Sequence, residues 1–375
     1  MVRTKLLLFV ALLLGVGAAR AADMSDRVVV GELTLAPGGE QAYFTVSLEG
    51  SEECYTAYDI KLTLPAGMEL VYKGGTPYVL MAKGSESIYP SVTEEDPIEG
   101  ITTTTYSHSL QSAMIKDNVL RVLCYSATNE SLTATSGALF HVFVKASPYA
   151  RPGVMPITVV DATLVTADGS KYVAEDHVSE AVQAGATSTL TLEVSAMSQY
   201  ATCVLPFDYA LPTDSSLVAY ACEQHTDDAL LLIPVERLHA YTPYILYSEL
   251  GFSAQLTGEV DAAAYPANGM ARDGLLVGVL TDTPLGEGCY VMQDQGEGVR
   301  FYYVDDIPYM LTAGKCYVEM PEGVSALSFY IGETTAVQTP QVQDEPIIYN
   351  ILGQRVQQMI PGRIYIVNDR KVIAE

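Results

Sequence analysis

Residues 33–48 read LTLAPGGEQAYFTVSL, one β-strand, a turn and a second β-strand. Polar and apolar residues alternate on both sides of Pro37-Gly38-Gly39, which is typical of strands that bury one face. Proline and glycine end the first strand and let the chain reverse. This stretch predicts consecutive strands at residues 27–35 and 41–48.

Similar strand patterns follow along most of the chain, at residues 57–64, 119–125, 139–145 and 154–166. Ala167-Asp168-Gly169-Ser170 is predicted as a hairpin turn. No window has the pattern of a convincing amphipathic helix, and Ser109–Ala113 forms one helical turn at most. Strands spaced roughly 8–12 residues apart indicate sandwiches or barrels. The sequence predicts an all-β fold: two β-sandwich-like domains in tandem plus a small C-terminal β-hairpin.

The first predicted domain, residues 22–190, has an order of strands and turns that resembles a known superfamily. Its phrases are LTLAPGGEQAYFTVSL, LPAGMELV at residues 64–71 and DNVLRVLCYSATNESLTATSGALFHVFVKA at residues 117–146. This order resembles the cohesin-like and carbohydrate-binding sandwich superfamily. The resemblance implies a β-sandwich that binds a surface protein or a glycan.

The second predicted domain, residues 191–335, contains SQYATCVLPFDYALP, GLLVGVLTDTPLGEGCYVMQ and MLTAGKCYVEMP. It resembles a β-rich domain that precedes the C-terminal tail in large Bacteroidetes surface proteins, which implies a spacer or attachment role. Residues 336–346 are a predicted linker, and residues 347–375 a predicted sorting or attachment hairpin. The tail, IIYNILGQRV followed by PGRIYIVNDRKV, resembles type IX secretion sorting domains in abbreviated form. That resemblance implies contact with the secretion machinery.

Residues 1–21 have the layout of a secretory signal peptide. Arg3 and Lys5 form a basic start, Leu6–Ala18 is apolar, and Ala19-Arg20-Ala21 places a cleavage site before Ala22. The apolar run is shorter than the roughly 20 residues that span a bilayer. We therefore expect export to the cell surface or the extracellular space, with no transmembrane segment after cleavage.

The charge balance makes some partners improbable. The chain has 45 acidic and 20 basic residues, a net charge of −25, and no basic cluster. Such a surface repels phosphate backbones, so we expect no binding of nucleic acid. An apolar content of 49% is that of a folded chain rather than a disordered acidic tail.

An even number of cysteines in an exported chain permits disulfides. A bridge within the first half must join Cys54 to Cys124, and in the second half Cys289 with Cys316 and Cys203 with Cys222 are candidate pairs. Buried, unpaired thiols fit the same pattern equally well. The six residues are Cys54, Cys124, Cys203, Cys222, Cys289 and Cys316.

Candidate catalytic groups are few and scattered, so the sequence favours a protein that is not an enzyme and needs no cofactor. The five histidines stand in no catalytic motif, and a hydrolase with a dispersed site is the remaining enzymatic alternative. Three acidic runs lack the spacing of a calcium loop and are expected to be solvated. The histidines are His108, His141, His177, His225 and His239, and the acidic runs are Glu94-Glu95-Asp96, Asp227-Asp228 and Asp305-Asp306.

Tyrosine dominates the aromatic residues, with 25 tyrosines against 8 phenylalanines and no tryptophan. A tyrosine ring pairs an apolar face with a polar tip, which suits recognition surfaces. Tyr78, Tyr89 and Tyr106 lie on a stretch from Lys73 to Ile115 that is expected to be irregular, and they are the candidate ligand contacts. The favoured function is non-catalytic binding or adhesion through the first sandwich, by a sheet face or these loops. The alternative is a carbohydrate-binding protein for glycan capture.

Overall fold

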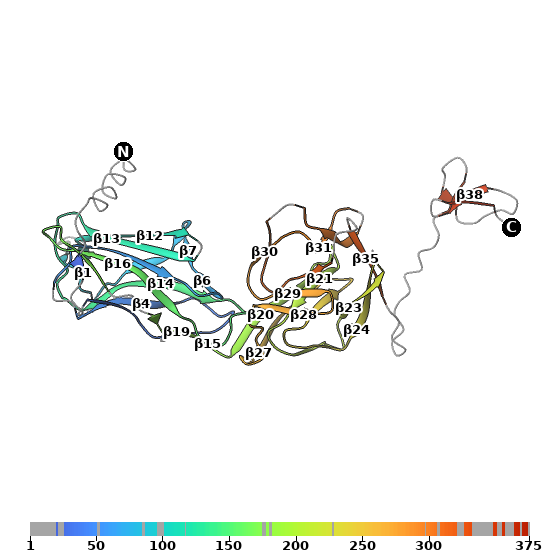
Figure 1. Cartoon of the computed structure of the whole chain (residues 1–375), viewed down its shortest axis with the longest axis horizontal. Coiled ribbons are helices and arrows are strands. Elements are labelled where there is room, and N and C mark those ends of the chain that lie inside the picture. Colours follow the sequence, from blue (N-terminus) through green and yellow to red (C-terminus); the bar gives the residue numbers. More distant parts are fainter. Residues whose placement is uncertain are drawn as a thin grey trace. The chain divides into compact units, whose positions relative to one another are not determined.

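The computed structural model describes most of residues 26–331 and four short strands of the tail (Figure 1). The chain divides into two compact units, Met1–Ile331 and Gly332–Glu375. Every described element is a strand, which confirms the all-β class. The described part contains no helix long and apolar enough to cross a membrane. The described ranges are 20–21, 26–50, 53–84, 87–95, 101–116, 118–174, 178–179, 182–226, 229–296, 298–305, 308–320, 326–331, 348–350, 355–356, 364–367 and 370–373.

The N-terminal lobe, which comprises residues 20–21 and 26–184, has two main sheets. A seven-stranded sheet contains, in spatial order, β1 (Arg20–Ala21), β17 (Lys171–Val173), β16 (Ile157–Val165), β5 (Ala57–Thr63), β13 (Val119–Ser126) and β12 (His108–Lys116), with β18 (Val178–Ser179) also on β16. A five-stranded sheet contains β2 (Arg27–Val30), β4 (Ala42–Glu49), β14 (Gly137–Ala146) and β6 (Met68–Leu70), with β9 (Val79–Met81) also on β14. A small sheet contains β15 (Gly153–Val154), β19 (Val182–Ala184) and β3 (Leu33–Leu35).

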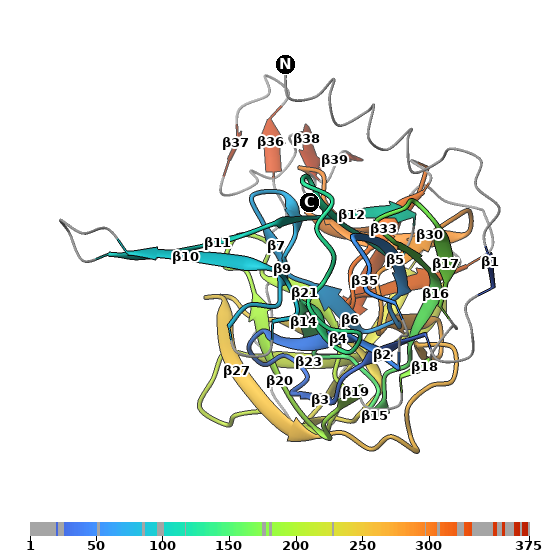
Figure 2. The ribbon, with the colours of Figure 1, turned by 90° about the vertical axis from the view of Figure 1, so that its left-hand side faces the viewer.

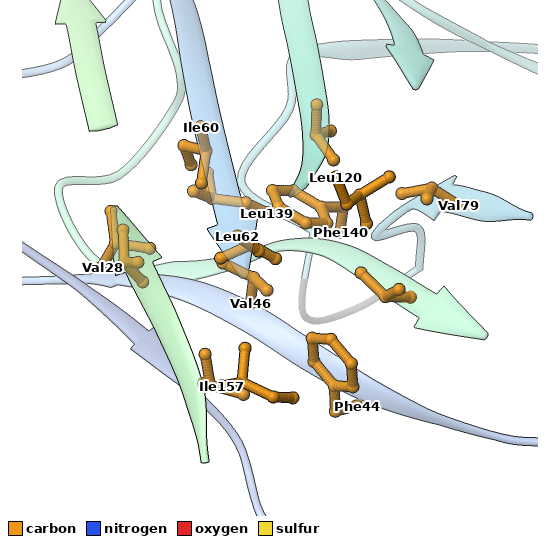
Figure 3. Packing of buried hydrophobic residues seen from close by; sticks show 14 of the residues in the cluster. Val28, Phe44, Val46, Ile60, Leu62, Val79, Leu120, Leu139, Phe140 and Ile157 are labelled. Atoms are coloured by element: carbon orange, nitrogen blue, oxygen red, sulfur yellow. The ribbon is translucent and has the colours of Figure 1, made fainter. Parts of the chain in front are cut away.

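The core of this lobe follows from the alternation seen in the sequence. In β4, Phe44, Val46 and Leu48 are buried, while the residues between them are partly or fully exposed. Successive side chains of a strand point to opposite faces, so every second residue reaches the core. Figure 3 shows Phe44 and Val46 among buried side chains that include Ile60 and Leu62 of β5.

Two expectations for this lobe are corrected. The strand predicted over residues 27–35 is two strands, because β2 pairs with β4 whereas β3 pairs with β19 of the small sheet. The stretch from Lys73 to Ile115 is largely extended rather than irregular, and the turn considered at Ser109–Ala113 lies inside β12. Figure 2 shows that the paired strands β10 and β11 of this stretch project outward from the N-terminal lobe. The strands of this stretch include β7 (Tyr72–Lys73) paired with β8 (Thr76–Pro77), and β10 (Ser91–Glu95) paired with β11 (Thr102–Tyr106).

The C-terminal lobe, residues 187–331, is built on a ten-stranded sheet with its own core. The main sheet contains, in spatial order, β21 (Tyr200–Val204), β26 (Pro243–Tyr247), β23 (Val218–Thr226), β24 (Ala229–Val235), β35 (Ala326–Ile331), β32 (Val299–Tyr303), β31 (Cys289–Asp294), β34 (Cys316–Glu319), β29 (Leu276–Val279) and β28 (Met270–Asp273). Three strand pairs accompany it: β20 (Thr187–Val194) with β27 (Phe252–Glu259), β22 (Tyr209–Ala210) with β25 (Arg237–Leu238), and β30 (Thr283–Leu285) with β33 (Tyr309–Leu311).

The first and eighth strands of this order are in contact through hydrogen bonds. The hydroxyl of Thr202 in β21 accepts the Cys316 N–H at 2.9 Å, and the Val204 N–H donates to the Gly314 carbonyl at 3.1 Å. The ten-stranded sheet therefore curls back on itself at β21 and β34.

The two lobes share specific contacts around Tyr149. Its side chain packs against the core of the C-terminal lobe, and its carbonyl accepts the Tyr265 hydroxyl at 3.2 Å. A Cβ at Gly314 would collide with the Tyr149 ring and hydroxyl, so glycine is needed there, also because its φ is +83°. Ser188 donates its hydroxyl to the Pro148 carbonyl at 2.6 Å. The predicted domain boundary at residue 190 stays a prediction.

The second unit has more strands than expected. The sequence predicted a two-stranded hairpin, but four short strands form one antiparallel sheet. One strand, β36, pairs with both β37 and β38, and β38 also pairs with β39. The strands are β37 (Arg355–Val356), β36 (Ile348–Asn350), β38 (Ile364–Val367) and β39 (Arg370–Ile373). The predicted linker at 336–346 and the signal peptide up to residue 19 lie outside the described residues.

Candidate binding surface

An aromatic cluster lies on the outer face of the five-stranded sheet. β4 and β14 pair so that Tyr43 stands opposite Phe143 and Thr45 opposite His141. Their neighbours Phe44 and Val142 are buried, so Tyr43, His141 and Phe143 occupy the alternate, outward positions. Tyr78 joins them because its carbonyl accepts the Phe143 N–H at 3.0 Å. We call Tyr43, Tyr78, His141 and Phe143 the aromatic face.

The four rings of the aromatic face contact one another in the spatial order His141, Tyr43, Phe143 and Tyr78. Tyr78 and Phe143 are stacked, with centroids 4.2 Å apart and planes 24° apart. Tyr43 lies 5.3 Å from Phe143 and 4.7 Å from His141 in tilted geometry. Tyr43 is 49% exposed. The sheet thus presents a continuous, partly exposed aromatic surface held in place by the rings' mutual contacts.

A lysine and a hollow border this surface. The ammonium of exposed Lys73 lies 5.0 Å from the Tyr78 ring centroid, a cation–π distance. No described carboxylate forms an ion pair with Lys73. Beside it is a hollow of about 440 Å³ between β8, β9 and β12. It is lined by Lys73, Thr76, Pro77, Tyr78, Val79, Leu110, Gln111 and Ser112.

Tyr89 is not available as a ligand contact, contrary to the expectation from sequence. It is only 3% exposed. Its hydroxyl donates to the Leu139 carbonyl at 2.7 Å and lies 2.6 Å from the Tyr58 hydroxyl. Burial raises the pKa of both phenols. This pair is a hydrogen-bonded part of the interior, since a buried polar group needs a partner.

Tyr106, the third predicted contact, is half-buried at the end of β11, where it meets the core of the lobe. Its hydroxyl accepts the Gly84 N–H at 3.3 Å, and the Lys83 ammonium lies 5.2 Å from its ring. It stands apart from the ring contacts of the aromatic face. Of the three predicted tyrosines, only Tyr78 belongs to that face, and the sequence did not indicate the ring contacts of Tyr43, His141 and Phe143.

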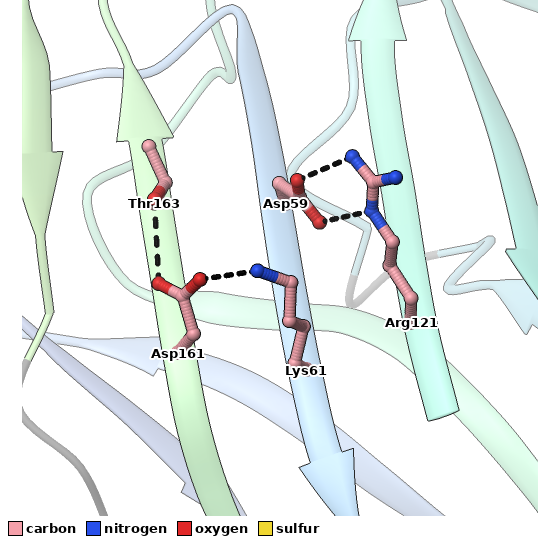
Figure 4. A network of polar contacts seen from close by, with 5 residues as sticks. All are labelled: Asp59, Lys61, Arg121, Asp161 and Thr163. Atoms are coloured by element: carbon pink, nitrogen blue, oxygen red, sulfur yellow. Dashed lines mark hydrogen bonds and ion pairs between the residues drawn. The ribbon is translucent and has the colours of Figure 1, made fainter. Parts of the chain in front are cut away.

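The outer face of the seven-stranded sheet is polar instead (Figure 4). Arg121 donates Nε and Nη2 to the two oxygens of Asp59 at 2.8 and 2.6 Å. On the next pair of strands, Lys61 Nζ lies 2.5 Å from Asp161, which also accepts the Thr163 hydroxyl. The hydrogen bonds between Arg121 and Asp59 raise the pKa of Arg121. We call Asp59, Lys61, Arg121 and Asp161 the ion-paired face.

All six cysteines are free thiols in the structure, five of them buried and Cys54 half-buried. Burial raises the pKa of Cys124 to about 12 and that of Cys203 to about 12. A thiol with such a pKa is almost entirely protonated near neutral pH, and the thiolate is the nucleophile. The interior thiols therefore have the properties of structural residues.

Strand pairing bears on the candidate disulfides of the second half. Cys289 stands opposite Glu319 on β34, three positions from Cys316, and the two thiols belong to different hydrophobic clusters. Cys203 and Cys222 lie on β21 and β23, which are separated by β26. The structure therefore brings neither pair together on neighbouring positions. The Cys54–Cys124 pair stays a prediction.

The described histidines stand in different surroundings. His108 is buried, with Nδ1 2.9 Å from the Ser107 hydroxyl. Burial lowers the pKa of His108. His141 Nδ1 lies 2.9 Å from the Thr45 hydroxyl, and His239 lies 3.7 Å from Asp208. His177 and the side chain of His225 lie outside the described residues.

The acidic runs that were weighed as calcium ligands are described only in part. Glu94 and Glu95 are exposed on β10, and Asp305 is exposed after β32. Asp168 is explained by its turn: it accepts the Thr166 hydroxyl at 2.6 Å and the Ser170 N–H at 3.0 Å. In the part of the chain that is described, no cluster of three or more His, Cys, Asp or Glu residues is placed to hold a metal ion.

Comparison with known proteins gives structural likenesses only. No family model matches the chain, and no curated protein matches it. A cohesin in a type I cohesin–dockerin complex from Clostridium thermocellum is 16% identical, with 43% of this chain and 99% of that chain covered and a TM-score of 0.31.

Two further cohesins give similar values. A cohesin module from a Clostridium perfringens family 33 glycoside hydrolase is 10% identical over 44% of this chain and 98% of that chain, with a TM-score of 0.31. A non-cellulosomal cohesin from the archaeon Archaeoglobus fulgidus is 14% identical over 43% of this chain and 91% of that chain, with a TM-score of 0.27. At these values the likenesses assign no partner and no activity to this chain.

Proposed function

We propose that this chain is a non-catalytic binding or adhesion protein, and that the aromatic face of its N-terminal lobe is the contact surface. The observation that carries the proposal is the continuous ring contact from His141 through Tyr43 and Phe143 to Tyr78, on a sheet face that leaves Tyr43 half exposed. Rigid aromatic groups on a fixed scaffold bind with little loss of side-chain entropy, and they dominate many protein interfaces.

The partner is a protein surface that presents an apolar side chain next to an acidic group. The apolar group packs on Phe143 and Tyr43, and the acidic group meets Lys73 at the edge of Tyr78. Lys73 supports this chemistry because it has no carboxylate partner among the described residues, although the chain has 45 acids. A partner carboxylate there forms an ion pair without displacing one.

Glycan capture is the second candidate function. The half-exposed Tyr43 ring favours glycan capture, because the apolar face of a sugar ring can stack on an exposed aromatic ring. The absence of tryptophan from the sequence counts against it, since tryptophan gives the largest stacking surface. Binding of the full chain to an array of neutral oligosaccharides, lost on Tyr43→Ala, would move the protein to this class.

Export and attachment belong to the same proposal. The signal-peptide pattern at residues 1–21 and the tail at 347–375 support delivery to the cell surface or beyond, with the tail recognised by secretion machinery. A Bacteroidetes-like source and a type IX route rest on the tail's resemblance alone. Secretion of the full chain, compared with a chain ending at residue 346, tests the tail's part.

Site-specific photo-crosslinking tests the contact surface. A photo-crosslinking amino acid is placed at position 43, on the aromatic face, or at position 160 as a control. Val160 is 43% exposed on β16, in the other sheet of the same lobe. The full chain is then irradiated with native cell-surface extract. We expect a discrete adduct from position 43 only, lost when Phe143→Ser is added; equal adducts from both positions would overturn the proposal.

A further inference from the structure

A gap in strand pairing occurs in the C-terminal lobe, far in sequence from the aromatic face. β34 begins at Cys316, and its pairing with β31 ends at Val291 opposite Tyr317. β31 continues to Asp294. On the side that faces β34, Met292 and Asp294 therefore extend past the end of the partner strand.

Backbone hydrogen bonds fix which residues face this gap. The Glu319 N–H donates to Leu275, on the β29 side of β34, and the Met320 N–H donates to Gly288, on the β31 side. Directions alternate along a strand, so Cys316 presents its N–H and carbonyl on the β31 side. The Thr202 hydroxyl occupies that place, accepting the Cys316 N–H at 2.9 Å and donating to its carbonyl at 3.4 Å. If the β31–β34 pairing continued, the backbone of Met292 would bond to Cys316. The Thr202 side chain of β21 takes that place instead.

β21 forms the opposite wall of the gap. Its Val204 N–H points away from β26, to the Gly314 carbonyl, and Ser248 on the β26 side donates to Gln199. By alternation, Thr202 also presents its N–H and carbonyl away from β26. Among the described strands, none pairs with this edge of β21. Two strand edges, one from β21 and one from β31, therefore border the same gap.

The gap is an open cavity of about 540 Å³. Residues of both edges line it, including Thr202 and Met292. Its deeper wall contains buried Val291, Leu311 and Cys316, while its mouth carries exposed Glu193, Asp294 and Lys315. An extended segment can bury apolar side chains at alternate positions here, and two carboxylates against one ammonium favour basic residues at its ends.

We propose that this gap, the strand slot, accepts an extended, apolar segment with basic ends from a partner protein as an added β-strand. The added strand hydrogen-bonds to the slot-facing backbone groups of Thr202 on one side and Met292 on the other. Strand addition to an unpaired edge is an established mode of peptide recognition. It also satisfies edges that would otherwise be open to nonspecific pairing. The strand slot is independent of the aromatic face and of the function proposed for it.

Hydrogen exchange of the full chain gives the first test. In the free protein, we expect the amides of Thr202 and Met292 to exchange at least tenfold faster than those of Cys203 and Val291, whose N–H groups face paired strands. Equal protection at all four positions would mean that the slot edges are already paired, and would overturn the proposal.

A synthetic probe gives the second test. The blocked heptapeptide KVTVTVK alternates apolar and polar side chains and has basic ends. We expect it to bind saturably and to slow exchange at Thr202 and Met292 at least tenfold. N-methylation of either alternate set of its amides should weaken binding at least tenfold, because an inserted strand uses both edges. No protection by the probe, or unchanged binding of both methylated forms, would overturn the proposal.

Two neighbouring substitutions provide the matched control. Ser198 lines the slot, whereas Met197 is 93% exposed and does not. We expect Ser198→Trp to abolish protection by the probe and Met197→Trp to preserve it. Equal effects of the two variants would place the probe elsewhere and contradict the proposal.

Discussion

The two outer faces of the N-terminal lobe are built on the same strand geometry but carry opposite chemistry. The ion-paired face places Arg121 beside Asp59 and Lys61 beside Asp161, so each charge has its partner within the sheet. The aromatic face has rings that contact one another, and its bordering Lys73 has no described ion pair. A face whose polar groups are already paired gains little from a partner, whereas a partly exposed apolar face gains by losing water. The difference separates a surface that supports the fold from one that is free to bind.

The largest effect is expected from removing a ring of the aromatic face. Phe143 contacts both Tyr43 and Tyr78, so Phe143→Ser disrupts the whole cluster. Truncating a central aromatic residue of an interface commonly costs about 2 kcal/mol or more, roughly thirtyfold in affinity. The affinity is measured by titrating the partner identified by cross-linking, after its purification, into the parent chain and the variant. Val160→Ser is the control, and an equal loss there would erase the distinction between the faces.

An intermediate effect is expected on the ion-paired face, in stability and not in binding. Arg121→Met leaves Asp59, only 18% exposed, without its two charged hydrogen bonds. Hydrogen bonds to charged groups contribute about 1.5–3 kcal/mol, so we expect the free energy of unfolding to fall by about 1–2 kcal/mol after allowance for solvent. Urea titration measures the change.

The matched control for that variant is Arg272→Met. Arg272 pairs with Glu319, and both side chains are 50% exposed. An exposed pair contributes about 0–1 kcal/mol, so its loss should be the smaller of the two. Partner affinity should not change for Arg121→Met. A tenfold loss of affinity would show that the ion-paired face also binds.

The smallest effect is expected from His108, which is buried at the start of β12. Burial lowers its pKa below the ordinary value of 6.5, and the opposing charge of Glu130 offsets only part of this. Well above pH 6.5, the His108 ring is neutral in both the folded and the unfolded state. As the pH falls below 6.5, the unfolded state binds the proton first and the folded state loses stability.

The substitution His108→Gln should remove that loss. We expect the fall in unfolding free energy between pH 7.5 and pH 5 to be smaller in the variant than in the parent chain, as measured by urea titration at both pH values. Identical falls would show that His108 takes up its proton equally in both states.

Local pattern predicted the strands better than it predicted the surface. Phe44, Val46 and Leu48 alternate with polar residues, and the structure buries all three, as a period of two requires. The turn at Asp168 was also predicted, because an Asp-Gly pair forms it from neighbouring residues alone. The all-β class follows from many such segments.

The candidate surface depends on pairing between distant segments, which the local pattern does not contain. Tyr43 and Phe143 are one hundred positions apart, and only the β4–β14 register places them together. Tyr89 was expected to be a ligand contact because it lies on the Lys73–Ile115 stretch, which was predicted to be irregular. Its burial depends on the Tyr58 hydroxyl and the Leu139 carbonyl, which come from other strands. No residue near Tyr89 in the sequence indicates those partners.

The position of Tyr149 has a consequence for how the molecule comes apart. This residue belongs to the chain of the N-terminal lobe, yet it packs on the core of the C-terminal lobe beside Gly314. Tyr149 is only partly buried there, so burial of roughly half of a tyrosine's ~200 Å², at about 25 cal/mol per Å², contributes about 2–3 kcal/mol to the contact between the lobes. Heating should therefore melt residues 26–331 in a single calorimetric transition. A pulling force applied at one end would be resisted by both cores together rather than by each in turn.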